Sequence, residues 1–204
     1  MRLRWRALAC ALGLCAGITL PAAAAYSDVA AGAWYEAAVS EVTELGYMTG
    51  VSDTLFAPDA QVTRSTVVVV LWRMEGSPAP GATVSFGDVS PSAWYAQAAA
   101  WAKENGIANG DDRGDFSPDQ PVTRQELAAF LTRYDQYRGA ALAEGALNLY
   151  SDADQISSWA EESMRHAVGM GLLEGSGGLL QPAAPATRAQ LAVILQRLTT
   201  EAAG

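Results

Sequence analysis

Three arginines stand where a cation is unfavourable, at the first position of a predicted helix. They belong to the pairs Thr63-Arg64, Thr123-Arg124 and Thr187-Arg188, each of which follows a proline-containing loop. The amino end of a helix carries partial positive charge, so a cation there is disfavoured by roughly 0.3–1 kcal/mol. Because the chain makes this choice three times, we interpret the arginines as functional.

The chemistry that this arrangement favours is anion binding. Free N–H groups in the first turn of a helix attract an anion, and a guanidinium adds a planar fork that fits a carboxylate or a phosphate. The pattern predicts an anion pocket at the start of each such helix, and several pockets would bind a repeating polymer with avidity. The alternative that stays open is a solvated arginine or an ion pair with an aspartate such as Asp59 or Asp119.

The threonines that precede these arginines are expected to cap the helices. Thr123 and Glu126 fit a capping box, in which each side chain satisfies a backbone N–H of the first turn. Gln190 completes the same pattern in the third copy, whereas Thr66 stands at this place in the first. The first copy is therefore expected to have the weaker cap.

A second arginine follows each of the first three after nine residues. Nine steps of about 100° place it on the opposite face of the helix. We expect an ordinary surface or salt-bridge role on that face. These residues are Arg73, Arg133 and Arg197.

Three tryptophans recur with the arginines. Trp34, Trp94 and Trp159 lie 60 and 65 residues apart, each just before an apolar stretch with helical spacing. The first apolar residue of a helix most often packs in a core. The alternative is the wall of a binding pocket, with the aromatic face against a sugar ring, and both hold if the ring lies between two units.

These residues mark three copies of one unit, which reads as helix, loop and helix. Glycines follow each tryptophan at the twelfth and sixteenth positions, and a left-handed glycine is a common helix stop. A unit of two helices cannot bury its apolar face alone, so we expect the three copies to pack together around a shared axis. The glycines are Gly46, Gly106 and Gly171, followed by Gly50, Gly110 and Gly175.

The predicted fold class is all-α. The run Val67–Val70 is β-branched and alone would favour a strand, but its register with the other copies predicts a helix. The predicted organisation is a signal peptide at residues 1–25 followed by repeats at 26–80, 81–140 and 141–204.

The first 25 residues have the pattern of a secretory signal. A basic start precedes an apolar run, Ala7–Leu20, that is too short to span a membrane, and small residues follow at Ala23–Ala25. Both cysteines, Cys10 and Cys15, lie in this segment, so the exported chain is expected to have no disulfide. The formal net charge of −9 argues against a nucleic-acid partner, which needs a basic surface.

The repeated residues resemble the S-layer homology (SLH) domain family. The resemblance is carried by the Asp-Val openings at Asp28 and Asp88, the Phe-x-Pro-Asp loops at Phe56 and Phe116, the tryptophan-led helices, the glycine spacing and the Thr-Arg starts. It implies a three-pronged, pseudo-threefold helical module that binds secondary cell-wall polysaccharide in grooves between the prongs, often through pyruvate-ketal sugars. A pyruvate ketal presents a carboxylate, the kind of anion that the arginines favour.

The resemblance implies a non-catalytic protein that is exported and held at the cell wall, as in an S-layer, with no cofactor and no metal. The third copy departs from the family pattern at Ala153 and Leu180, so the first two copies are expected to be the main binding units. The family's arginine corresponds to Arg64, Arg124 and Arg188, and the expected ligand-binding residues are these three with Trp34, Trp94 and Trp159.

Two other functions stay open. A surface assembly protein or adhesin would bind another protein through the same scaffold, although the Arg113–Asp115 tripeptide reads as a loop turn. A cell-wall glycosidase would need two carboxylates flanking a cleft, and His166, the one histidine, has no evident partner in the sequence. No second apolar stretch is long enough to cross a membrane after signal cleavage.

Overall fold

The regular structure is helical over the part of the chain that is described. The computed structural model describes residues 26–81 and 86–201, so the predicted signal peptide lies outside it. Three short 3-10 helices accompany the α-helices in the third repeat. The α-helices are α1 (Glu36–Glu44), α2 (Arg64–Met74), α3 (Ala96–Glu104), α4 (Arg124–Tyr137), α5 (Glu161–Gly169) and α6 (Arg188–Glu201), and the 3-10 helices are Leu147–Leu149, Ala153–Gln155 and Ser158–Ala160.

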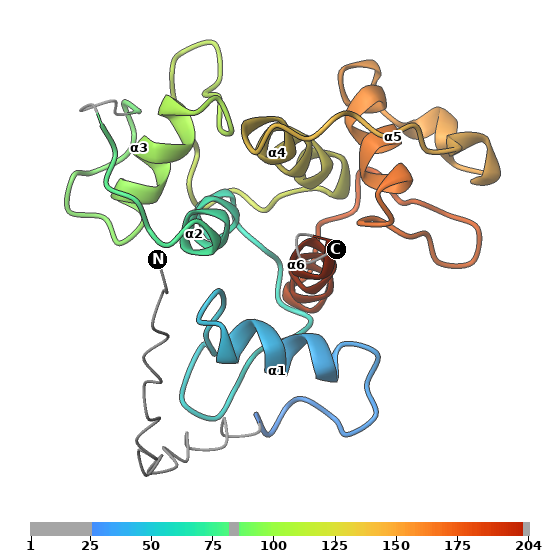
Figure 1. Ribbon diagram of the computed structural model, residues 1–204, viewed down its shortest axis with the longest axis horizontal. Helices are drawn as coiled ribbons and strands as arrows, with labels where there is room; N and C mark the ends of the chain where they lie inside the picture. Colours follow the sequence, from blue (N-terminus) through green and yellow to red (C-terminus); the bar gives the residue numbers. More distant parts are fainter. Residues whose placement is uncertain (1–25, 82–85, 202–204) are drawn as a thin grey trace, which may run out of the picture.

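The helices form three prongs that meet at the centre of the module. Figure 1 shows α2, α4 and α6, the second helices of the three repeats, close to the middle and viewed nearly along their axes. The first helices, α1, α3 and α5, lie further out in three directions. The all-α class predicted from the repeats and the three-pronged architecture implied by the resemblance are both confirmed.

Each prong is built from two different repeats. The second helix of one repeat packs against the first helix of the next: α2 against α3, α4 against α5, and α6 against α1. The last of these pairs closes the ring, because it joins the third repeat to the first. The expectation that one helix–loop–helix unit cannot bury its own apolar face is confirmed.

A ring of backbone hydrogen bonds ties the three repeats together. The N–H of Val62 donates to the carbonyl of Ala186 at 2.9 Å, that of Ala186 to Val122 at 2.8 Å, and that of Val122 to Val62 at 2.8 Å. Each of these residues lies directly before the threonine of its Thr-Arg pair. The three equivalent bonds give the module its pseudo-threefold symmetry.

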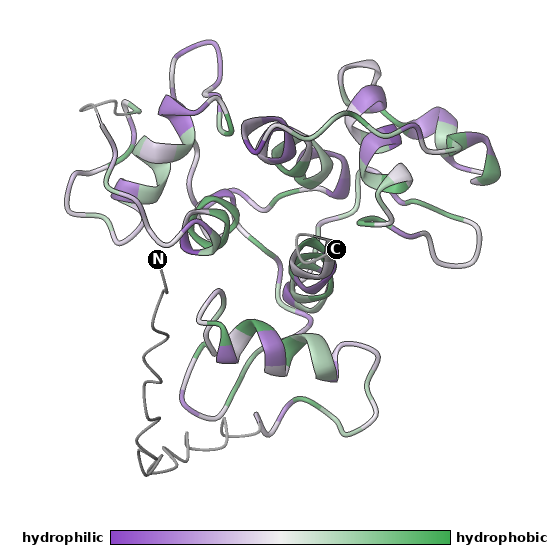
Figure 2. Ribbon diagram, in the orientation of Figure 1, coloured by the Kyte–Doolittle hydropathy of each residue, from purple (hydrophilic) through white to green (hydrophobic). Residues whose placement is uncertain are grey.

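Helix α2 shows how packing overrides local propensity. Val67, Val68, Val69 and Val70 are all helical and all at least 96% buried. Burial of each aliphatic side chain is worth about 1.5–3 kcal/mol, more than the small helix penalty of a β-branched residue. Each helix of the module combines apolar and hydrophilic residues, as Figure 2 shows.

Three aspartates fix the loops that lead into the second helices. In each repeat the opening aspartate accepts two hydrogen bonds from consecutive backbone N–H groups of that loop. The second residue of each N–H pair has a positive φ, between 52° and 57°. The bonds run from Phe56 and Ala57 to Asp28 (2.8 and 2.7 Å), from Phe116 and Ser117 to Asp88 (2.7 and 2.6 Å), and from Leu180 and Gln181 to Asp152 (2.8 and 2.7 Å).

Candidate functional site

The three Thr-Arg arginines reach across the repeat boundaries. Arg124 begins α4 in the second repeat, but its Nε donates to the Leu180 carbonyl at 2.7 Å and its Nη2 to the Glu174 carbonyl at 2.9 Å, both in the third repeat. The other two arginines do the same in cyclic order. Arg64 binds the carbonyls of Phe116 (2.6 Å) and Asn109 (3.2 Å), and Arg188 binds those of Phe56 (2.8 Å) and Thr49 (2.6 Å).

These contacts leave much of each guanidinium available. A guanidinium has five N–H donors, and the carbonyl bonds use two of them. No carboxylate among the described residues forms an ion pair with Arg64, Arg124 or Arg188, so the alternative of a partner at Asp59 or Asp119 is wrong. Burial lowers the pKa of all three groups from the ordinary arginine value. Each is therefore a partly desolvated cation with no carboxylate of the described residues in ion-pair contact.

The helix N–H groups do not provide the free donors that the sequence predicted. The N–H of Arg124 donates to the carbonyl of Ala184 at 2.9 Å, and the N–H of Gln125 donates to that of Pro182 at 3.0 Å. The next N–H donates to the capping threonine, and the other two helix starts have equivalent bonds. This part of the prediction is wrong, because the next repeat's loop supplies backbone acceptors. The group at each helix start that could attract an anion is therefore the guanidinium.

The three tryptophans are exposed. Trp34 is 65% exposed, Trp94 66% and Trp159 57%, so the expectation of a core position is wrong for all three. The rings of Trp34 and Trp94 contact the following tyrosines edge-on, at 5.2 and 5.3 Å between centroids. An indole this exposed contributes little to packing and leaves most of its surface open to solvent.

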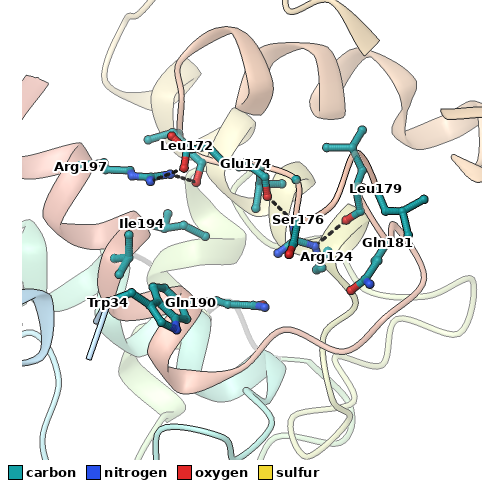
Figure 3. A pocket seen from close by; sticks show the side chains of 14 residues that line it. Trp34, Arg124, Leu172, Glu174, Ser176, Leu179, Gln181, Gln190, Ile194 and Arg197 are labelled. Atoms are coloured by element: carbon teal, nitrogen blue, oxygen red, sulfur yellow. Dashed lines mark hydrogen bonds and ion pairs between the residues drawn. The ribbon is translucent and has the colours of Figure 1, made fainter. Parts of the chain in front are cut away.

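One groove, here called groove A, has a volume of about 420 Å³. It is formed by the third-repeat segment 172–181 and by α6 residues 190–197, with Arg124 and Trp34 from the other two repeats. Figure 3 shows Arg124 and Arg197 on opposite sides of it, with Trp34 close to Gln190 and Ile194. Arg197 forms an ion pair with Glu174 at 2.8 Å.

A second groove, groove B, repeats this plan with a volume of about 280 Å³. It is formed by residues of the second-repeat loop 109–120 and by α4 residues 126–133, with Arg64 and Trp159. The Arg64 guanidinium lies over the rings of Phe116 and Phe130, 5.1 and 5.2 Å from their centroids. The aromatic rings therefore hold the charged group at the groove wall.

Each groove is lined by residues of all three repeats, an arrangement that the sequence did not predict. Arg124 shares groove A with Trp34, and Arg64 shares groove B with Trp159, so neither arginine meets the tryptophan of its own repeat there. The binding units therefore cannot be assigned to single copies. The second arginines Arg133 and Arg197 line the grooves as well. The expected salt-bridge role is confirmed for Arg197, which pairs with Glu174.

His166 is paired with Asp135, a partner that the sequence did not reveal. Its Nε2 lies 2.9 Å from Oδ2 of Asp135, and its Nδ1 accepts a hydrogen bond from the Ala143 N–H at 3.0 Å. Both side chains are almost completely buried, so they cannot reach a substrate in solvent. The pair joins α4, α5 and the segment between the second and third repeats.

The chain is similar to parts of larger proteins. An endoglucanase from Bacillus sp. (strain KSM-635) is 32% identical over 180 residues, which are 85% of this chain and 18% of that protein. The surface-layer 125 kDa protein of Lysinibacillus sphaericus is 32% identical over 164 residues, 78% of this chain and 14% of that protein. A cellulosome-anchoring protein of Acetivibrio thermocellus is 24% identical over 156 residues, 74% of this chain and 35% of that protein. The chain thus spans a minor part of each relative's length.

A family model for the S-layer homology domain matches residues 25–67, 85–128 and 149–192. Each segment overlaps one of the three copies found in the sequence, and together the segments cover more than half of the chain. Across residues 26–81 and 86–201, no helix combines the length and apolarity needed to cross a membrane. The family match and the surface-layer relatives confirm the expected location at the cell surface. The chain belongs to the S-layer homology domain family and carries three copies of its domain.

Proposed function

We propose that this protein is a non-catalytic module that attaches to anionic, pyruvylated secondary cell-wall polysaccharide. The observation that carries the proposal is a partly buried guanidinium without a counter-ion, facing a groove whose rim carries an exposed tryptophan. Grooves A and B both have this arrangement. Arg188 makes equivalent carbonyl contacts at the third helix start.

The proposed binding chemistry uses both groups. The carboxylate of a pyruvate ketal would accept charge-assisted hydrogen bonds from the guanidinium donors that the loop carbonyls leave free. The apolar face of the sugar would pack on the indole ring. Because the polymer repeats its sugar and the module repeats its groove, weak sites would add up to firm attachment.

A role in attachment fits the relatives, in which the matched segment is a small part of the whole protein. An endoglucanase and a surface-layer protein share this segment. Because their names state different roles, the shared segment is expected to have a function of its own. The acid that lines groove A, Glu174, is paired with Arg197. This arrangement does not supply the two free carboxylates that a glycosidase uses.

The proposal is tested by measuring how much protein sediments with purified wall polymer. The measurement is repeated with polymer from which the pyruvate has been removed chemically. Arg124→Ala and Trp34→Ala are each expected to weaken binding about tenfold or more, the cost of a charge-assisted contact or an aromatic one. Arg165→Ala is the matched control, because Arg165 pairs with Glu161 on the exposed face of α5. Removing the pyruvate is expected to reduce wild-type binding to the level of the variants.

Arg124 also holds the loop carbonyls of Leu180 and Glu174, so its variant needs a thermal melt beside the binding assay. Trp34→Ala keeps the test decisive, because a side chain 65% exposed contributes little to stability. Undiminished binding by a folded Trp34→Ala or Arg124→Ala variant would overturn the proposed site. Binding to a purified surface protein, with none to the polymer, would favour the assembly or adhesin function instead.

A further inference from the structure

The second arginines of the three second helices differ in their partners. Arg197 donates from Nη1 to the carbonyl of Gly171 at 2.8 Å and pairs with Glu174 at 2.8 Å. Arg73 donates from Nη1 to the carbonyl of Tyr47 at 3.2 Å. Arg133 has no hydrogen bond and no ion pair with any described residue, although burial lowers its pKa. Of these three equivalent residues, only Arg133 is left without a partner in the described chain.

Arg133 lies in groove B with Arg64, so that groove contains two guanidinium groups. Burial is the main cause of the lowered pKa of Arg64; Glu126 opposes the shift and the charge of Arg133 adds to it. Because both guanidinium groups line the same groove, their positive charges repel each other. Such repulsion inside a partly desolvated groove is relieved when a bound anion contacts both groups.

The carboxylates that line groove B have hydrogen-bond or ion-pair partners other than Arg64 and Arg133. Oε2 of Glu126 accepts hydrogen bonds from the N–H of Thr123 at 2.8 Å and from its hydroxyl at 2.7 Å. Asp111 accepts two bonds from the Arg113 guanidinium, at 2.9 and 3.1 Å, and Asp115 lies 3.7 Å from the same group. These carboxylates complete a helix cap and a loop, and none forms an ion pair with either arginine of the groove.

We propose that groove B is selective for a sugar that carries two negative charges, and that Arg133 binds the second charge. Groove A takes a singly charged sugar, because its corresponding arginine, Arg197, is neutralised by Glu174. This inference rests on the proposed function and names the ligand class of one of its grooves. The two grooves thus recognise different sugars of the same wall, or different positions along one polymer.

Three hexoses of different charge test the selectivity in the intact protein: glucose 6-phosphate, glucuronate and methyl glucoside. NMR signals of the Arg64 and Arg133 guanidinium groups and of the Trp159 indole report on groove B. At about pH 7.5, where a phosphate monoester is mostly doubly charged, glucose 6-phosphate is expected to bind groove B about tenfold more tightly than glucuronate. Near pH 5 the phosphate loses one charge, so this preference is expected to disappear while both arginines stay charged.

The matched variants are Arg133→Gln and Arg197→Gln, which remove the same group from groove B and groove A. Arg133→Gln is expected to lower the affinity for glucose 6-phosphate about tenfold and to change that for glucuronate by less than about threefold. Its melting temperature is expected to equal or exceed that of the wild type, because an unpaired desolvated cation is lost. Arg197→Gln is expected to lower the melting temperature and to leave the preference of groove B unchanged.

Equal affinity of groove B for the two charged sugars, or an unaltered preference in Arg133→Gln, would overturn this inference. Wild-type protein that still sediments with pyruvylated wall polymer would in that case leave the proposed function standing. Failure of the wild type to bind the polymer at all would overturn the proposed function itself. The two failures are therefore distinguishable.

Discussion

In each repeat, one aspartate near the start of the repeat fixes the loop that the arginine of another repeat contacts. Asp28 accepts hydrogen bonds from the N–H groups of Phe56 and Ala57, and the carbonyl of Phe56 accepts one from Nε of Arg188. The N–H of Phe56, acting against desolvation, holds the pKa of Asp28 below its ordinary value. The ionised carboxylate therefore keeps the loop in the shape that places the arginine.

Acid is expected to weaken this link. The unfolded-state pKa of an aspartate is about 3.9, and the folded-state pKa of Asp28 lies below it. The stabilisation from Asp28 is therefore complete above about pH 5 and is lost as the pH falls through the lowered pKa. Melting temperatures between pH 7 and pH 3 should show Asp28→Asn less stable than wild type at neutral pH, with a difference that narrows in acid. A difference independent of pH would contradict this role of the carboxylate.

The sequence identified the residue types of the candidate site but not their grouping. Arg64, Arg124 and Arg188 were found because an unfavourable helix position recurs three times. Their acceptors lie between 45 and 139 residues away in the chain, so no local pattern could reveal which loop each guanidinium reaches. Arg133 was placed correctly on the opposite helix face, but only the assembled ring shows that this face lines the neighbouring groove.

At the scale of the helices, periodicity and capping predicted most of the structure. All three second helices begin directly after their threonine, and glycines with positive φ follow the first helices at Gly46, Gly106 and Gly171. Helix α4 has the reciprocal capping box expected from Thr123 and Glu126. In α2 the Thr63 hydroxyl accepts from the N–H of Thr66, but no carboxylate returns the bond. Local rules succeeded here because the bonds are local.

The difference between the two caps can be measured. Glu126→Ala removes both bonds that its carboxylate accepts and is expected to lower the free energy of unfolding by about 0.5–2 kcal/mol. Thr66→Ala removes a side chain that makes one hydroxyl contact, to Thr63 at 2.9 Å, and is expected to cost less than about 0.5 kcal/mol. Urea denaturation of the two variants compares them directly. Equal losses would show that the reciprocal bond adds nothing.

At the scale of the molecule, the repeats are units of sequence and the prongs are units of structure. The prongs are α6 with α1, α2 with α3, and α4 with α5, so every repeat contributes to two of them. The sequence predicted that the units must pack together, but periodicity within a helix says nothing about which neighbour covers its apolar face. The cyclic exchange of partners explains why one repeat alone has no complete core.

Removal of the third repeat is therefore expected to affect the whole module. Without residues 141–204, α1 loses α6, α4 loses α5, and the central ring of backbone bonds is broken at Ala186. The shortened chain is expected to show no cooperative thermal transition by circular dichroism. A chain that lacks only residues 1–25 is the control and is expected to melt cooperatively. A sharp transition in the shortened chain would show that two repeats form an independent core.

The prong formed by the first and last helices also has a mechanical consequence. The chain itself joins α2 to α3 and α4 to α5, whereas α1 and α6 are held by contacts such as those of Gln196 and Thr199 with the Glu41 carboxylate, at 2.6 and 3.1 Å. Tension applied between the two ends of the module therefore loads this contact before any other prong. Since Trp34 borders groove A from the α1 side, such a pull would open groove A first and leave groove B intact.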